Sequence, residues 1–348
     1  MKGFVGEMNN NITIDDVARL AGVSRATAGR VVGGYGSVSD ASREKVHAAV
    51  KELNYSPNLI AQGLRSHSTK TIAVILGSIK NNYCNTLVYS VEKEALKKGY
   101  NVIICNSHED IDQEIKHLQN MRSRQVDGII IMSAFRADEQ IPEKYRELYE
   151  SGFPIVYVDR KIQGIEKNIF QSNNMDASYE ATKYLLELGH KRIGVIATAD
   201  YSTVRERIKG YSKALEDYNI LFAEDMIVSV PLNDKDEAQN MTAQLLDRHS
   251  DMTAIYVLNN SLCNGVLLEF KKRNLRIAED MSLLVWDDEA LNELYDITTV
   301  VQQIEKIGKL ATKKLIELIC NPDKEVKSDT EILETHMICR KSCGRINR

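Results

Sequence analysis

Residues 12–32 read ITIDDVARLAGVSRATAGRVV, a stretch that marks the start of two short helices and joins them by a tight turn. Thr13 stands three residues before Asp16, which is the spacing of a capping box at a helix N-terminus. Gly22 suits a helix C-terminus, and Ser24 suits the N-cap of a second helix. Two helices joined by so few residues must cross steeply. The stretch therefore predicts a helix-turn-helix.

A third helix is predicted to begin after Ser39. Its apolar residues Val46, Ala49, Val50 and Leu53 recur at the spacing of one helical face. Three helices with such faces can enclose a small core. The N-terminal region is therefore predicted to be an all-α domain.

The second helix of this domain carries the side chains with the clearest chemistry. Arg25, Thr27 and Arg30 lie near its start, where side chains can reach base edges and phosphates in a major groove. The alternative is that the two arginines are ordinary solvated surface charges. The combination of cap, turn, second cap and third helix favours DNA binding.

Composition sets the scale of the rest of the chain. Its 348 residues, 43% of them hydrophobic, suffice for two or three domains with their own cores. Residues 1–70 carry nine Lys and Arg against six Asp and Glu, so the net charge of −4 hides a basic head on an acidic body. The longest apolar runs are strand-length, and the N-terminus lacks the apolar segment of a signal peptide. We therefore expect a cytoplasmic protein without membrane spans.

From residue 71 onward, short β-rich runs alternate with amphipathic stretches, which is the pattern of parallel sheets with crossover helices. The runs are too many for one open sheet of this kind, and their spacing divides them into two groups of four near residue 165. Two Rossmann-like lobes are therefore predicted, with a ligand in the cleft at the carboxyl ends of the strands. The predicted strands are 72–76, 102–105, 128–132, 155–158, 192–196, 227–230, 254–258 and 282–286.

Several motifs, taken with the helix-turn-helix, resemble the lactose and galactose repressor family of bacterial transcription regulators. The N-terminal motifs are Ile14–Ser24, Val38–Ser39, Leu53–Asn58 and Ala61–Leu64. The later motifs, in the order that the family would place them, are Leu185–Val195, Arg207–Tyr211, Glu279–Ser282 and Asp287–Asp288. The resemblance covers nearly all of residues 12–343.

The resemblance implies a homodimeric, ligand-controlled transcription repressor and not an enzyme. Two periplasmic-binding-protein-like α/β lobes would follow an all-α head, and the partners would be double-stranded operator DNA and a small effector such as a sugar, with no cofactor. The implied boundaries are 1–55 for the head, 56–70 for a hinge and 71–348 for the core. Because the family's chain crosses between the lobes more than once, lobe 1 would hold about 71–165 and 295–325, and lobe 2 about 166–294 and 326–348.

The hinge has a start signal of its own, because Ser56 and Pro57 suit the beginning of a helix that runs to about Arg65. So short a helix is marginal alone, and Gly63 lowers its stability by ~1 kcal/mol relative to Ala. In the family, this hinge forms on operator DNA, and a leucine matching Leu64 wedges into the minor groove. The alternative for Leu64 is one end of an amphipathic interdomain helix. The predicted DNA contacts are Thr13, Ser24, Arg25, Ala26, Thr27, Arg30, Asn58, Ala61, Leu64 and Arg65.

Polar residues near the ends of predicted strands are the candidate effector contacts. Asp159, Asn259 and Asp287 each follow a strand directly, and Arg207 lies early in the helix after strand 192–196. In the family these positions line the effector pocket, where carboxylates and a guanidinium suit the hydroxyls of a sugar. Trp286, the only tryptophan, would add an aromatic wall. The alternatives are that the Asp and Asn residues cap the next helix and that Trp286 belongs to the core.

Four departures from the family pattern limit what the resemblance implies. Gly29 stands where a serine is usual, which removes a hydroxyl that contacts phosphate, and Ala26 replaces a longer side chain that commonly reads a base. The half-site preference of the family therefore does not carry over. Residues 33–36, GGYG, stand where the family has an Asn-rich turn, and Val285 replaces a glycine before the aromatic-Asp pair of the cleft.

Other chemistries have weaker support in the sequence. His336, Cys339 and Cys343 lack zinc-site spacing, the predicted strand over 332–339 would point the first two to opposite faces, and the scattered cysteines indicate no disulfide framework. A sugar-binding protein without DNA function would leave residues 12–65 unexplained. An enzyme on a doubly wound fold would explain the parallel sheets, but no nucleophile elbow, P-loop or dinucleotide fingerprint appears in the sequence. A purine or a protein partner stays open as the effector.

Overall fold

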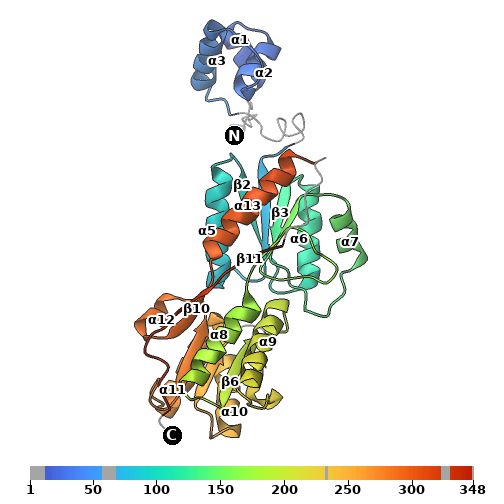
Figure 1. The fold of residues 1–348 in the computed structure, drawn as a ribbon. Coiled ribbons are helices and arrows are strands. Elements are labelled where there is room, and N and C mark those ends of the chain that lie inside the picture. Colours follow the sequence, from blue (N-terminus) through green and yellow to red (C-terminus); the bar gives the residue numbers. More distant parts are fainter. Residues whose placement is uncertain (1–11, 57–67, 232–233, 323–329, 347–348) are drawn as a thin grey trace, which may run out of the picture. The chain divides into compact units, whose positions relative to one another are not determined.

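The computed structural model describes residues 12–56, 68–231, 234–322 and 330–346 (Figure 1). Contacts within the chain separate two compact units, one ending at Thr69 and the other beginning at Lys70. The described part of the first unit is helical, and the second unit is α/β. Each unit has its own buried core.

Three described helices build the N-terminal unit. They are α1 (Ile14–Ala21), α2 (Arg25–Gly33) and α3 (Asp40–Glu52). Val17, Ala28 and Val46, one from each helix, are buried together in the core. Helix α3 begins after Ser39 as predicted, although the Ser39 hydroxyl donates to the Ser42 hydroxyl, at 3.0 Å, and not to the backbone.

The caps predicted for the first two helices are confirmed. The hydroxyl and the backbone N–H of Thr13 donate to the Asp16 carboxylate at 2.7 and 2.9 Å. Gly22 ends α1 with a φ of 62°, a left-handed conformation that glycine adopts without strain. At the start of α2, the Ser24 hydroxyl oxygen accepts the backbone N–H of Thr27 at 3.1 Å. The turn between the helices is thus fixed by local hydrogen bonds.

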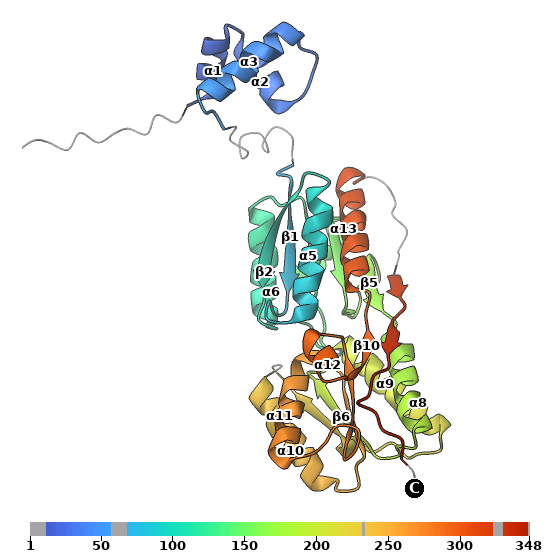
Figure 2. The ribbon, with the colours of Figure 1, turned by 90° about the vertical axis from the view of Figure 1, so that its left-hand side faces the viewer.

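Lobe 1 of the second unit is built around one parallel sheet (Figure 2). Its elements are β1 (Thr71–Leu76), α5 (Asn82–Leu96), β2 (Asn101–Asn106), α6 (Ile111–Ser123), β3 (Gly128–Ile131), α7 (Glu143–Glu150), β4 (Ile155–Val158), β5 (Ile169–Ser172), α13 (Ile304–Cys320) and β11 (Thr330–Leu333). The strands lie in the order β11-β5-β4-β3-β1-β2. Helices α5 and α13 pack on one face of the sheet, and α6 and α7 pack on the other.

Lobe 2 repeats this plan with a second sheet. Its elements are α8 (Asn174–Glu187), β6 (Ile193–Thr198), α9 (Ser202–Asp217), η1 (Glu224–Met226), β7 (Ile227–Val230), α10 (Lys235–Arg248), β8 (Ala254–Val257), η2 (Asn260–Leu262), α11 (Cys263–Arg273), β9 (Ser282–Trp286), α12 (Ala290–Leu294), β10 (Thr298–Val301) and β12 (His336–Ile338). The order is β12-β10-β9-β8-β6-β7, and only the β12–β10 pair is antiparallel among the described pairs. Helices α8 and α9 cover one face, and α10 and α11 cover the other.

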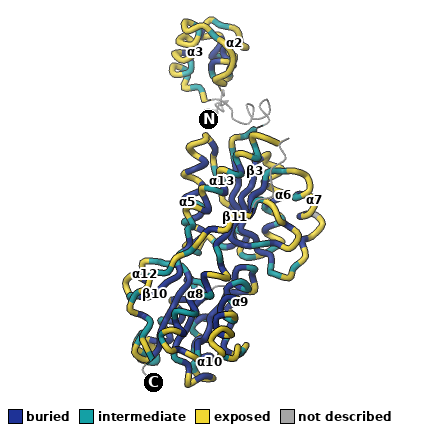
Figure 3. The backbone as a smooth tube through the Cα atoms, in the orientation of Figure 1, coloured by how far each residue is buried: buried dark blue, intermediate teal, exposed yellow. Residues whose placement is uncertain are grey.

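The eight strands predicted from the sequence are all confirmed, as β1 to β4 and β6 to β9. Strands β3, β4, β8 and β9 are buried along their whole length, and Figure 3 shows this for β3. Parallel strands with helices on both faces read as continuous apolar runs, which is why the sequence showed them clearly.

The single strand predicted over residues 332–339 is wrong. The chain forms two strands there, β11 in lobe 1 and β12 in lobe 2, separated by Glu334 and Thr335. The backbone N–H of Thr335 donates to Asn173 Oδ1 at 2.9 Å, outside either sheet. An extended chain that passes from one sheet to another keeps the alternation of a single strand, so the pattern did not show the break.

The predicted lobe boundaries are also corrected. Strand β5 still belongs to lobe 1, β10 belongs to lobe 2, and β11 returns to lobe 1, so the described chain crosses between the lobes three times. The crossings are joined to one another: Gln303 Nε2 donates to the carbonyl of Glu334 at 2.6 Å, and the N–H of Asn173 donates to the carbonyl of Leu333 at 3.1 Å. Four-residue strands beside a crossing carry too little apolar pattern to show which sheet they join.

The described structure also bears on membrane spans and on metal sites. No helix in the described ranges is long and apolar enough to cross a membrane. No group of three or more His, Cys, Asp or Glu side chains in the same ranges is placed to hold a metal ion. Cys105 is buried in lobe 1.

Candidate functional site

The outer side of α2 carries three of the residues predicted to contact DNA. Arg25, Ala26 and Arg30 are exposed, whereas Ala28 faces the core. Since residues four apart share one side of a helix, Ala26 and Arg30 lie on the same solvent-facing strip. Arg25 Nε lies 3.4 Å from the Asp15 carboxylate of α1, a surface pair too exposed to hold the guanidinium firmly. Both arginines are therefore available to a ligand.

The hydroxyls predicted to contact DNA already have partners within the unit. Thr13 is part of the capping box of α1, and Ser24 caps α2. The Thr27 hydroxyl lies 2.9 Å from the Ser24 hydroxyl. Residues 57–65 of the predicted hinge helix lie outside the described residues, and so do the contacts assigned to it, namely Asn58, Ala61, Leu64 and Arg65.

Asp159 and Asp287 occupy equivalent places in the two lobes. Each directly follows the carboxyl end of a strand, β4 or β9, and their φ angles are 67° and 71°. Aspartate tolerates this left-handed conformation better than most residues. The N–H of Asp159 donates to the carbonyl of Phe170 and that of Asp287 to the carbonyl of Val300, both at 2.8 Å. These bonds fix the direction in which each aspartate leaves its sheet.

Arg207, on α9, is buried with a side chain fixed by three neighbours. Its Nε donates to Asn174 Oδ1 at 2.9 Å, and its Nη1 donates to the carbonyl of Leu258 at 2.6 Å. The guanidinium carbon lies 3.8 Å from the centroid of the Trp286 ring. A guanidinium held by two hydrogen bonds over an aromatic face cannot reorient freely. The guanidinium of Arg207 is thus held in one orientation before a ligand binds.

Burial and charge shift the pKa values of these groups. Burial raises the pKa of Asp287 to about 6, opposed by Arg207 and by Gln302, whose Nε2 donates to the carboxylate at 2.7 Å. Burial also raises the pKa of Asp159, again opposed by Arg207. All three side chains are described, and no ion pair within 4 Å joins Arg207 to either carboxylate. The positive charge of Arg207 therefore lowers the pKa of both carboxylates without forming an ion pair with either of them.

Buried polar atoms without partners lie in the same place. Within the described residues, the Tyr83 hydroxyl, Trp286 Nε1 and Gln302 Oε1 have no hydrogen-bond partner. Burial raises the pKa of Tyr83, and the charges of Asp159 and Asp287 raise it further, so its phenol stands near both carboxylates. Buried polar groups in folded proteins nearly always have partners. These atoms therefore mark a position for a polar ligand.

A depression of about 380 Å³ has Tyr83, Asp287 and Gln302 among its lining residues, whereas Asp159 and Arg207 are buried and do not line it. Lobe 1 lines it with Asn82 and Tyr83 at the start of α5, and lobe 2 lines it with Asp287–Glu289 and Gln302. This volume is in the range of small-molecule sites. Because both lobes line it, a ligand there touches both.

Asn259 and Trp286 have structural roles that the sequence analysis named as alternatives. Asn259 Oδ1 accepts the backbone N–H of Ser261 at 3.0 Å and its hydroxyl at 2.5 Å, which caps η2. Trp286 is fully buried in the core of lobe 2. Its ring is also the surface against which Arg207 rests. Direct effector contact by either residue stays a prediction.

Sequence reasoning missed Tyr83, Asn174 and Gln302. Tyr83 had a usable signal, because Asn81 accepts its N–H at 2.8 Å and caps the helix that follows β1, which places this turn at the carboxyl end of a strand. Asn174 and Gln302 lie at crossings between the lobes. Nothing in the local pattern indicated those crossings.

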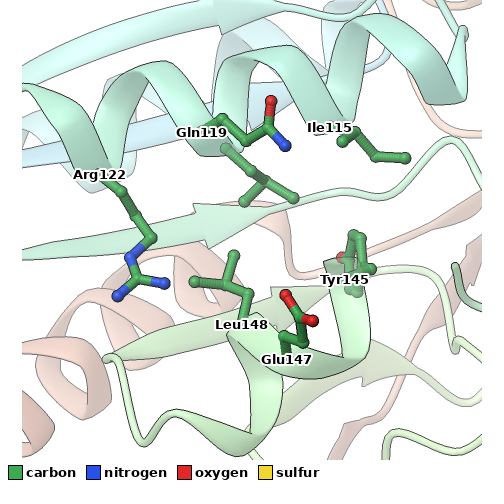
Figure 4. Close-up of a pocket in the computed structure, with 7 residues that line it drawn as sticks. Ile115, Gln119, Arg122, Tyr145, Glu147 and Leu148 are labelled. Atoms are coloured by element: carbon green, nitrogen blue, oxygen red, sulfur yellow. The ribbon is translucent and has the colours of Figure 1, made fainter. Parts of the chain in front are cut away.

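A second depression, of about 240 Å³, lies in lobe 1 between α6 and α7 (Figure 4). Its lining is mostly apolar, with Ile115, Leu118 and Leu148, and its charged residues are Arg122 and Glu147. Unlike the depression between the lobes, it is lined by none of Tyr83, Asp287 and Gln302. Its chemistry suits a hydroxyl-rich ligand poorly, so the depression between the lobes is the candidate effector site.

Two protein-family models match the chain. The model of bacterial regulatory proteins, lacI family, matches residues 13–58. The model of periplasmic binding proteins and sugar binding domain of LacI family matches residues 69–341. The chain belongs to the LacI family.

Relatives of this LacI-family chain match it almost from end to end. The HTH-type transcriptional repressor PurR of Vibrio atlanticus (strain LGP32) is 31% identical over 318 residues, which cover 90% of this chain and 93% of that protein. The solved transcriptional regulator CelR-cellobiose complex is 28% identical, with a TM-score of 0.70 and coverage of 95% and 99%. The lac repressor dimer bound to operator and the anti-inducer ONPF, 24% identical with a TM-score of 0.84 over 96% and 99%, shares the fold.

LacI-family membership confirms the main predictions from the sequence. The fold is a helix-turn-helix head with two α/β lobes. The chain is a DNA-binding transcription regulator of the repressor family, controlled by an effector in the cleft between the lobes. Its relatives are transcription regulators.

Proposed function

We propose that this LacI-family regulator is a homodimeric repressor whose effector is a sugar held by Asp159, Arg207 and Asp287. The observation that carries the proposal is a guanidinium fixed over Trp286, near two buried carboxylates that it does not touch. Neighbouring hydroxyls of a sugar pair well with carboxylates and guanidiniums. The relative solved with cellobiose supports this class of ligand.

The site also supplies a mechanism for control. Asp159 belongs to lobe 1, and Arg207 and Asp287 belong to lobe 2. A ligand that bonds all three stabilises one arrangement of the lobes over others. We infer that this arrangement sets the approach of the two hinge segments, residues 56–70 of each subunit, and so stabilises or melts the hinge helix on DNA.

On the DNA side, the proposal assigns residues 1–55 to the reading head. Helix α2 enters the major groove with Arg25 and Arg30, and the two heads of a dimer read the halves of a near-palindromic operator. Leu64 of each subunit wedges the minor groove at the centre. A protein with this role works where bacterial DNA is held, in the cytoplasm.

Exposed apolar side chains of lobe 1 support the homodimer. Strand β2 is an edge of its sheet, and Ile104 on it is 51% exposed. On the neighbouring α5, Tyr89 and Leu96 are 55% and 65% exposed. Exposed apolar side chains on neighbouring elements are candidates for an interface. We assign this face to contact with a second copy of the chain, and the lac repressor, solved as a dimer, supports the dimeric state.

Isothermal titration of the full chain with mono- and disaccharides and with purines tests the effector proposal. We expect one sugar to bind the wild type and to fail with Asp287→Ala and with Arg207→Ala. Asp236→Ala, which changes an exposed carboxylate on α10, is the matched control and should bind normally. Binding of a purine but no sugar, or no loss in the two site variants, would overturn the assignment.

The direction of control follows from a second titration. The sugar is added to the protein bound to operator DNA, and fluorescence anisotropy of the DNA reports release or tighter binding. Release identifies an inducer, and tighter binding identifies a corepressor. A sugar that binds but leaves operator affinity unchanged would contradict the proposed coupling between the cleft and the hinge.

A further inference from the structure

A strip of the outer side of α2 has no side chains of its own. Gly29 and Gly33 are four residues apart and therefore share one side of the helix. Tyr35, just beyond the helix, fills the space that they leave. A Cβ placed on Gly33 would lie 2.3 Å from Tyr35 Cε1, and a Cβ placed on Gly29 would lie 3.8 Å from the Tyr35 hydroxyl oxygen. The phenol ring thus lies along the helix, with its hydroxyl beside Gly29.

The turn after α2 is built to fold Tyr35 back. Gly34 and Gly36 have φ angles of 69° and 75°, conformations that residues with a Cβ rarely adopt. Between them, the N–H of Tyr35 donates to the carbonyl of Arg30 at 3.1 Å. The N–H of Gly34 donates to the carbonyl of Val31 at 3.2 Å. The unusual sequence at 33–36 therefore holds the aromatic ring of Tyr35 against α2.

The surroundings of Tyr35 are cationic and open. Tyr35 is 55% exposed, an unusual state for a ring that packs on its own helix. The Arg30 side chain passes the next residue, since its Cδ is 3.4 Å from the position of a Cβ on Gly36. In the described part of the chain, the Tyr35 hydroxyl enters no hydrogen bond. A free donor on an exposed surface that also carries an arginine is suited to an anion such as a phosphate.

We propose that Tyr35 is a DNA-contacting residue whose hydroxyl donates a hydrogen bond to a phosphate oxygen of the operator. The proposal rests on the assignment of α2 as the recognition helix. The ring takes the place of side chains that Gly29 and Gly33 lack, and it carries a hydroxyl to the strip beside Arg30. Phosphate contacts of this kind fix the register of a protein on the duplex without reading sequence directly.

Three variants of the full chain test this proposal, with affinity measured by fluorescence anisotropy on a duplex selected by the wild type from a random pool. Tyr35→Phe keeps the ring and removes only the hydroxyl, and we expect affinity to fall about tenfold. Gly33→Ala should weaken binding similarly, because the new Cβ displaces the ring, although alanine favours the helix itself. Adding Gly29→Ser to Tyr35→Phe returns a hydroxyl to the strip and should restore much of the loss.

Salt dependence separates this contact from those of the arginines. Tyr35→Phe should leave the slope of log affinity against log salt unchanged, because tyrosine releases no counterion, whereas Arg30→Ala should reduce the slope by about 1. Wild-type affinity in Tyr35→Phe together with weakened binding in Arg30→Ala would overturn the role of Tyr35 alone. Wild-type affinity in both would overturn the assignment of α2 as well. Loss in Tyr35→Phe without any rescue by Gly29→Ser, together with a lowered melting temperature, would reduce Tyr35 to a packing residue.

Discussion

The Tyr201 hydroxyl of lobe 2 donates a 2.7 Å hydrogen bond to the Glu109 carboxylate of lobe 1. Arg160 holds the same carboxylate, with Nη1 and Nη2 donating at 2.6 and 3.0 Å, and its guanidinium carbon lies 3.5 Å from the centroid of the Tyr201 ring. Burial, the largest single effect, raises the pKa of Glu109, but the charge and hydrogen bonds of Arg160, the Tyr201 hydrogen bond and the charge of Arg136 together lower it below its usual value. Arg160 directly follows Asp159, so this contact between the lobes begins one residue from the proposed effector site.

Replacing Tyr201 by phenylalanine should loosen the contact between the lobes. The buried carboxylate of Glu109 loses one donor, which costs about 1–3 kcal/mol. We expect a lower urea midpoint for the core. We also expect a changed affinity for the effector, since the arrangement of the lobes that this hydrogen bond stabilises becomes less stable relative to other arrangements. Tyr179→Phe, which removes a surface hydrogen bond to Asp217, is the control. Equal midpoints for both variants would show that the Tyr201 bond does not hold the lobes.

Asp287→Asn should change how stability depends on pH. The pKa of Asp287 is raised from 3.8 to about 6 in the folded chain, so the stabilisation from its proton is complete below pH 3.8 and is lost as pH rises through 6. Asparagine stays neutral, so the variant should exceed the wild type in unfolding free energy above pH 6, by at most about 3 kcal/mol. Urea unfolding at pH 4.5 and pH 8 measures the difference, which should be about one third as large at the lower pH. The same difference at both values would contradict the assignment.

Ser24→Ala should destabilise the head. The Ser24 oxygen caps α2 by accepting the N–H of Thr27 at 3.1 Å, and loss of such a cap costs about 1 kcal/mol. Hydrogen exchange at the Thr27 amide should become faster, while exchange in the lobes stays as it was. Ser37→Ala, an exposed serine between α2 and α3, is the matched control. Unchanged protection at Thr27 would mean that the cap contributes nothing.

Gly210→Ala should destabilise lobe 2. A Cβ on Gly210 would lie 2.1 Å from the carbonyl oxygen of Met175 and 2.8 Å from the backbone nitrogen of Tyr179, so α8 and α9 would have to move apart. Overpacking against backbone costs about 1–3 kcal/mol or more. Lys209→Ala, on the exposed side of the same helix, should leave the melting temperature nearly unchanged. A melting temperature for Gly210→Ala equal to that of the control would show that the helices adjust freely.

Most of the fold that was predicted correctly rests on signals that lie within a few neighbouring residues of the sequence. Thr13, Ser24 and Gly22 act through neighbours within a few residues, so their roles are visible in one stretch of chain. The eight predicted strands are apolar runs buried between layers of helices, and such runs are visible for the same reason. Strands β5 and β10 read IFQS and TTVV, and nothing in four residues states which sheet they join.

The residues of the candidate site also fall into two groups, those with a local signal in the sequence and those without one. Asp159 and Asp287 were found because each follows a strand that the sequence showed, and the structure brings both near Arg207. Asn174 and Gln302, which fix Arg207 and Asp287, come from segments where the chain passes between lobes. Their partners lie 33 and 15 residues away, so only the folded chain reveals the contacts.

The three crossings also govern the order in which the chain matures during translation. The head is complete in sequence by Glu52, but lobe 1, which begins at Thr71, lacks α13 and β11 until the ribosome has passed Leu333. Until Cys320 has been made, the face of its sheet that packs against Ile307 and Leu315 is covered by α5 alone. Domains usually mature from the N-terminus as they emerge. Here lobe 1 is completed only after β6 to β10 of lobe 2 have been synthesised, and a nascent chain displays a DNA-reading head well before its control module exists.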